Sequence, residues 1–205
     1  MRSNRVPRTA LIVLTASFLS APLSGQPALD ITLKQGTVRE AQTRDQLRRL
    51  VTTYDLSPWI FTTAIVVDER SIPHSHPVLT LHARHLMDDD LMLSTFVHEQ
   101  LHWFLVKNGE ATDKAIADLR VLFPTVPGKP PDGAQDEHST YLHLIDCYLE
   151  YRADQQLLGE LKARQVMEFW AADHYTWVYR TVLERERDIS SIVSKYKLNP
   201  VARSG

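Results

Sequence analysis

The order of hydrophobic patterns along the chain is the feature that most constrains its fold. Residues 59–67 are rich in β-branched and aromatic side chains, and Val78 to His82 alternates apolar with polar positions, so both segments are predicted strands. After His82 the spacing of apolar residues becomes helical and stays so. A few strands followed by many helices predict an α+β domain, in contrast to an alternating parallel sheet.

Helices are predicted over six segments: 41–54, 91–106, 112–122, 139–158, 160–172 and 177–196. Residues 26–40 are expected to be extended or frayed, and prolines and glycines predict a loop between the third and fourth helices. The second helix follows three aspartates, Asp88 to Asp90, whose carboxylates can cap its free amides and complement its dipole.

Size and charge limit the classes of function. The chain has 205 residues, 43% of them hydrophobic, which suits one globular domain with a sizeable core. Its formal net charge is −2, so there is no basic excess to favour nucleic-acid binding. Cys147 is the only cysteine, so no disulfide can form within the chain.

The first 25 residues have the pattern of an export signal. Three arginines precede an apolar stretch at residues 10–19, and small residues follow it. We expect cleavage after Gly25, with Ala21 as the alternative site, and export to the periplasm or the medium. An uncleaved membrane anchor is the other interpretation, but about ten apolar residues are too few to span a bilayer comfortably. The mature chain, residues 26–205, is then predicted to be a single domain without stable membrane insertion.

The sequence His98-Glu99-Gln100-Leu101-His102 carries the clearest chemistry. Two histidines four residues apart lie on nearly one face of a helix, so both can offer a ring nitrogen to one ion. Zinc accepts such nitrogens at about 2.0–2.1 Å and lowers the pKa of its bound water to about 7. Glu99, beside them, can take the proton of that water during attack on a carbonyl. The spacing therefore predicts one zinc ion per chain and a hydrolytic site.

A third protein ligand is expected from the helix at 139–158, which offers Glu150 and His143. These two are seven residues apart, about 10.5 Å along the helix, so they can hardly both bind one zinc. Glu150 is favoured because Asp154, one turn later, can accept a hydrogen bond from the outer nitrogen of a zinc-bound histidine. His143 is then expected to line the cleft above the metal or to be a core histidine.

Together, the His98–His102 motif and the downstream Glu150-Tyr151-Arg152-Ala153-Asp154 resemble the gluzincin metallopeptidases. The match covers roughly residues 60–160. The resemblance implies a zincin-like fold, in which a small N-terminal sheet precedes a mostly helical part and the zinc site lies between helices. It also implies Glu150 as the third ligand, Glu99 as general base, and an edge strand, here Val78 to His82, that can hold an extended peptide.

No motif identifies the group that stabilises the oxyanion. The best candidates are His174 and Tyr179, which could donate hydrogen bonds to developing negative charge, although for the tyrosine the favoured interpretation is that it anchors a helix in the core. Four further histidines are expected to be loop or sheet-surface residues and not a second metal site: His74, His76, His82 and His85.

These observations predict a zinc metallopeptidase that acts on peptides or proteins outside the cytoplasm. Two alternatives stay open: a zinc hydrolase of a non-peptide amide or ester, and a metal-binding domain without turnover. Glu99 speaks against the second alternative, because zinc binding alone does not need a base. No pattern in the sequence predicts an oligomeric state.

Overall fold

The computed structural model describes residues 26–200, so the predicted export signal lies outside the described residues. The described chain begins with β1 (Asp30–Leu33), α1 (Val38–Thr53), η1 (Ser57–Trp59), β2 (Ala64–Val67), β3 (Leu79–Leu81) and η2 (Ala83–His85). Five helices follow: α2 (Asp89–Lys107), α3 (Gly109–Leu122), α4 (Glu137–Leu158), α5 (Glu160–Asp173) and α6 (Thr176–Lys195). A small sheet followed by helices confirms the α+β layout. Within residues 26–200, no helix is long and apolar enough to cross a membrane.

The sheet has three strands in the order β1-β2-β3, and all of them are parallel. Its parallel direction was not predicted, and β1 lies inside the segment expected to be merely extended. Helix α1 connects β1 to β2 and packs on the sheet, where its Leu47 and Leu50 join Ile65 of β2 in one buried cluster. Residues from α2, among them Phe96, complete this cluster, so α2 packs on the sheet as well.

The predicted strand at 59–67 is real only over β2, its last four residues. Upstream, the backbone N–H groups of Phe61 and Thr62 donate to Oε1 of Gln100 at 2.7 and 2.9 Å. The amide nitrogen of Gln100 in turn donates to the Thr62 carbonyl at 2.8 Å. Because a side chain of α2 satisfies these backbone groups, residues 61–62 need no strand partner, and α2 is fixed to the chain ahead of the sheet.

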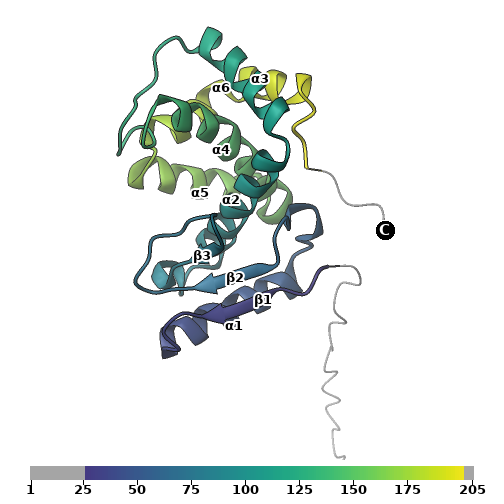
Figure 1. Cartoon of the computed structure of the whole chain (residues 1–205), viewed down its shortest axis with the longest axis vertical. Coiled ribbons are helices and arrows are strands. Elements are labelled where there is room, and N and C mark those ends of the chain that lie inside the picture. The colour runs from purple at the N-terminus through teal and green to yellow at the C-terminus, as the bar shows by residue number, and fades with distance from the viewer. Residues whose placement is uncertain (1–25, 201–205) are drawn as a thin grey trace, which may run out of the picture.

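The helical half surrounds α4. Figure 1 shows the sheet and α1 at one end of the molecule and helices α3 to α6 at the other, with α2 running from one to the other. Helix α4 packs against α2, α5 and α6, and its residues Leu144, Ile145 and Leu149 are almost completely buried. Because α4 is buried on so much of its circumference, its polar side chains need hydrogen-bond or charge partners inside the protein.

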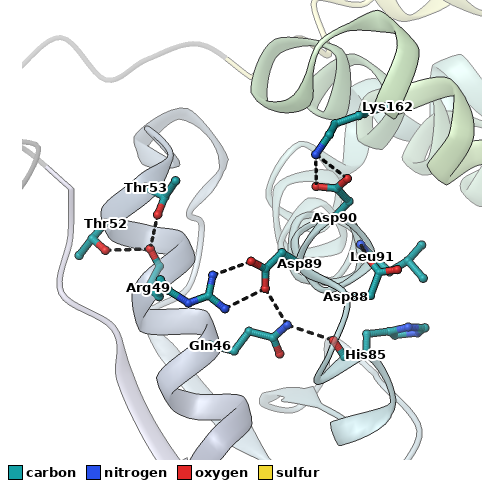
Figure 2. A network of polar contacts seen from close by, with 10 residues as sticks. All are labelled: Gln46, Arg49, Thr52, Thr53, His85, Asp88, Asp89, Asp90, Leu91 and Lys162. Carbon is teal, nitrogen blue, oxygen red and sulfur yellow. Dashed lines mark hydrogen bonds and ion pairs between the residues drawn. The ribbon is translucent and has the colours of Figure 1, made fainter.

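The three aspartates at the start of α2 make three different attachments, one to the helix itself, one to α1 and one to α5 (Figure 2). Asp88 is the N-cap, and its Oδ1 accepts the N–H of Leu91 at 3.0 Å. Asp89 receives two hydrogen bonds from Arg49 of α1, and Asp90 lies 2.9 Å from the ammonium group of Lys162 on α5. The capping prediction is confirmed, and the other two carboxylates fix α2 between the two halves of the molecule.

We expect Asp88→Ala to lower the free energy of unfolding by about 1 kcal/mol, because the substitution leaves the first-turn amides of α2 without their side-chain acceptor. Asp113→Ala on the exposed face of α3 is the control, and it should be neutral or slightly stabilising because alanine has the higher helix propensity. Urea unfolding of both variants measures the difference. Equal effects would contradict the capping role of Asp88.

Candidate metal centre

Helix α2 directs the side chains of its motif into the interior of the protein. His98 and Glu99 are buried, at 8% and 6% exposure, and His102 is partly buried. Gln100, between them, bonds to the backbone of residues 61–62. The side of α2 that bears His98 and His102 is therefore different from the side that Gln100 attaches to the neighbouring chain. The helix predicted from this motif is therefore confirmed, and its bounds come within two residues of the expected ones.

Helix α4 supplies four buried polar side chains at helical spacing. His143, Asp146, Glu150 and Asp154 recur every three or four residues, which places them along one face of the helix. All four are at most 7% exposed. Such burial of ionisable groups is rare unless each has a charge partner, a hydrogen-bond network or a metal ion.

Two sets of side chains among the described residues bring three potential ligand atoms within 4.8 Å of one another. One set is His98, His102 and His143, and the other is His98, Cys147 and Glu150. Either could hold a metal ion. The set expected from the sequence, His98 with His102 and Glu150, is split between them.

Glu150 accepts hydrogen bonds from three side chains on two other helices. Its Oε2 lies 2.9 Å from Nδ1 of His98 and 3.0 Å from the hydroxyl of Tyr179, and Ser94 donates to its Oε1. Ser94 in turn accepts the indole N–H of Trp170 at 3.0 Å. The hydroxyl of Tyr179, which the sequence offered as a donor to the oxyanion, is thus bonded to Glu150. Ser94 was missed, although its place one turn before His98 could have indicated it.

His143 lies against both histidines of α2. Its ring centroid is 5.0 Å from that of His102 and 5.6 Å from that of His98. The Nδ1 of His143 lies 2.6 Å from the carbonyl oxygen of Ser139. Because a carbonyl can only accept, this nitrogen carries the proton, and Nε2 keeps its lone pair free. His143 is therefore a buried histidine beside the motif, and it is not among the residues that line the cavity described below.

Asp146 lies deeper, between the two histidines of α2. Its Oδ2 is 3.1 Å from Nδ1 of His98 and 3.5 Å from Nε2 of His102, yet neither carboxylate oxygen has a hydrogen-bond partner in the described part of the chain. Burial raises the pKa of Asp146 to about 8. Burial also pulls the pKa of His98 down, but the charge of Asp146 and hydrogen bonds to Cys147 and Glu150 outweigh it and raise that pKa well above its usual value. The orphaned carboxylate shows that this pocket of the protein calls for positive charge.

Asp154 was expected to hold the outer nitrogen of a zinc-bound histidine. It is fully buried, but among residues 26–200 neither of its oxygens accepts a hydrogen bond, and burial raises its pKa well above the usual value. Glu150 holds Nδ1 of His98 instead. Glu150, one turn before Asp154 on α4, therefore makes the hydrogen bond to a motif histidine that was expected from Asp154.

A cavity of about 360 Å³ opens beside the motif, and Glu99 is in its wall. Its lining combines charged groups, among them Arg84 and Asp173, with the rings of His82, His85, Trp170, His174, Tyr175 and Tyr179. Burial raises the pKa of Glu99 to about 7. In the described part of the chain no group donates a hydrogen bond to the Glu99 carboxylate, in contrast to Glu150. His82 and His85 were expected at the surface of a loop or sheet, and His85 is instead buried against the Trp170 ring, 5.2 Å between centroids.

His174 faces this cavity with an ordered partner. Its Nδ1 lies 2.9 Å from Oδ2 of Asp173, and Asp173 also forms an ion pair with both terminal nitrogens of Arg84. The hydrogen bond from Arg84 is the main cause that lowers the pKa of Asp173 to about 2. A carboxylate on one ring nitrogen fixes the tautomer and leaves Nε2 toward the cavity. Sequence patterns gave no sign of Arg84, which comes from η2 on the sheet side.

The outer edge of β3 is partly occupied by the chain itself. His74 forms an isolated antiparallel bridge with Thr80, with the two backbone hydrogen bonds at 2.8 and 3.2 Å. Nearby, the His76 ring stacks on Trp103 at 4.3 Å between centroids, and the Trp103 indole donates to the Ser75 carbonyl. The central residue of the strand expected to hold a peptide is therefore already paired.

Tyr175 is a further residue that the sequence did not single out. It precedes α6 in the left-handed backbone conformation, at φ 46° and ψ 39°, which is unfavourable for a side chain of this size. Its ring lies 4.4 Å from that of His143 and stacks on that of His98 at 6.5 Å between centroids. Strained backbone of this kind gathers at functional sites, and here it sets an aromatic ring over two of the histidines.

Comparison of the chain with models of protein families, with curated proteins and with solved structures gives no match.

We expect Tyr175→Gly to be more stable than Tyr175→Ala by about 1 kcal/mol, because glycine adopts a positive φ without the steric cost that alanine incurs. Arg187, exposed on α6, is the matched control: there the glycine variant should be the less stable by about 1 kcal/mol. Denaturant unfolding of the four variants gives the two differences. If both pairs differ with the same sign, Tyr175 does not hold the left-handed conformation in solution.

Proposed function

We propose that this protein is a zinc-dependent hydrolase with its metal between α2 and α4, and most specifically a metallopeptidase. His98 and His102 bind the ion together with a third ligand from α4, one zinc per chain. The observation that carries the proposal is the position of Glu99. The Glu99 carboxylate lies in the wall of the cavity, and within residues 26–200 it accepts no hydrogen bond. It is next to His98, which belongs to both candidate ligand sets.

The donors suit zinc. Imidazole nitrogens are its usual ligands, and the orphaned Asp146 adds a negative charge that a divalent cation would offset. Zinc in such a site supplies Lewis acidity and makes water a nucleophile at neutral pH. A small sheet before the motif helix, with helices after it, agrees with the zincin-like fold and the gluzincin resemblance, which we retain as proposals.

In the proposed reaction Glu99 takes a proton from water as the water attacks the substrate carbonyl, and later delivers it to the leaving nitrogen. His174 lies in the wall of the same cavity and, when both of its ring nitrogens carry a proton, donates from Nε2 to the oxygen that becomes negative, while Asp173 keeps its ring oriented. The lining of the cavity accommodates an apolar or aromatic group next to the scissile bond. We therefore propose peptides with such a side chain as substrates.

A second candidate is a zinc hydrolase that acts on a small non-peptide amide or ester. The bridge between His74 and Thr80 favours it, because a long peptide cannot pair with the centre of β3 while that bridge exists. A peptide library and a set of small acylated amines and esters, each assayed with and without a chelator, separate the two candidates.

We also propose that the chain is exported, on the basis of its first 25 residues. Mass spectrometry of protein recovered from the envelope or medium should show an N-terminus near Gln26. Intact Met1 on protein confined to the cytoplasm would contradict export without affecting the proposed chemistry.

Glu99→Gln is expected to keep the fold and the bound zinc but to lose activity by about 10²–10⁴-fold, because the amide has nearly the same shape and cannot accept the proton. The matched control is Glu110→Gln, on an exposed carboxylate of α3, which should retain full activity. Metal content and turnover are measured on the same samples. Full activity of Glu99→Gln on a confirmed substrate would overturn the mechanism.

A further inference from the structure

We propose that the third metal ligand is His143, so that the ion is held by three histidines, and that Glu150 is a positioning residue that fixes the ring of His98. This inference rests on the proposed function and assigns the site more narrowly than the sequence did. It decides between two residues of one helix that stand seven positions apart and cannot both reach one ion.

Glu150 lies on the Nδ1 side of the His98 ring. Its Oε2 contacts Nδ1 of that ring at 2.9 Å, a hydrogen-bond distance, whereas two ligand atoms of a tetrahedral zinc lie about 3.4 Å apart. A carboxylate only accepts, so Nδ1 carries the proton and only Nε2 is free to bind a metal. The two nitrogens of an imidazole point in different directions, and Glu150 therefore does not face an ion bound at Nε2.

Both carboxylate oxygens of Glu150 already accept hydrogen bonds. Ser94, His98 and Tyr179 donate to its two oxygens, and the residue is completely buried. Turning the carboxylate toward a metal would leave the Tyr179 hydroxyl, itself buried, without its acceptor. Metal-bound histidines usually donate their outer N–H to such a fixed carboxylate.

His143 already has the position and the free ring nitrogen of a metal ligand. A ring nitrogen of His143 lies within 4.8 Å of one on His98 and one on His102. The Ser139 carbonyl holds its Nδ1 and so presents Nε2 with a free lone pair. The alternative set of His98 with Cys147 and Glu150 leaves out His102 altogether.

Asp146 is the remaining rival, because its 3.5 Å distance to Nε2 of His102 is close to that expected of two ligands on one ion. Its Oδ2 also lies 3.1 Å from Nδ1 of His98, the nitrogen that faces away from a metal at Nε2. We assign it to charge compensation behind the two rings, and the experiment below tests that assignment separately.

The test measures zinc affinity, zinc content and the number of coordinating imidazoles by X-ray absorption. The wild-type protein should show one zinc with three imidazoles. His143→Ala should weaken zinc binding at least 100-fold, and any residual site should show two imidazoles. Glu150→Gln keeps an oxygen that accepts from His98, so it should retain three imidazoles and lose less than about 10-fold in affinity, whereas Glu150→Ala and Asp146→Asn should each lose about 10–100-fold.

Two exposed residues of α4 provide matched controls, and His138→Ala and Glu137→Gln should bind zinc like the wild type. Circular dichroism of the metal-free variants, with the shift in Tm that zinc causes, identifies any variant that fails to fold. Two imidazoles in the wild type, or loss of zinc in Glu150→Gln or Asp146→Asn while His143→Ala binds normally, would overturn the assignment. A wild-type protein that binds no zinc would instead overturn the proposed function.

Discussion

The burial of Glu150 is the constraint on which the arrangement of the helices depends. A carboxylate with no exposure to water costs several kcal/mol unless donors surround it, and the protein provides three. These donors come from α2 and α6, and Ser94 extends the network to Trp170 of α5. One hydrogen-bond network centred on Glu150 therefore joins four helices. Any shift of one helix would leave a buried polar group unpaired, so the network defines their relative positions more strictly than apolar packing alone.

Helix α2 is the element that gains most from this network. It is held at its start by the carboxylates of Asp88 to Asp90, in its middle by Gln100, and across its inner face by the contact of His98 with Glu150. The motif residues lie between these attachments. Their side chains consequently have little freedom, and preorganised side chains are what both metal binding and proton transfer require.

The sequence was sufficient to predict a feature when all the residues that determine it lie in one short segment. Apolar spacing located the six α-helices of the described residues, and the His98–His102 motif fell on a buried helix face as its spacing required. It was insufficient where partners are distant in the chain. The strand predicted at 59–67 is shortened by Gln100, nearly forty residues later, and Arg84 reaches Asp173 across the cavity. Helical spacing also showed that His143 and Glu150 share a face, but it could not show which ring nitrogen of His98 each one meets, and that detail decides their roles.

The same bridge that pairs His74 with Thr80 also has a consequence for the behaviour of the protein in solution. An edge strand with free backbone N–H and C=O groups is a template for aggregation, because a strand of another molecule can pair with it. A sheet of three strands has two such edge strands. Here β3 is only three residues long, is fully buried and has its central residue paired within the chain. The opposite edge, β1, has four residues, begins with Asp30 and is followed by the charged Lys34. Neither edge offers a long apolar ladder, so this small parallel sheet has little tendency to recruit other copies of the chain.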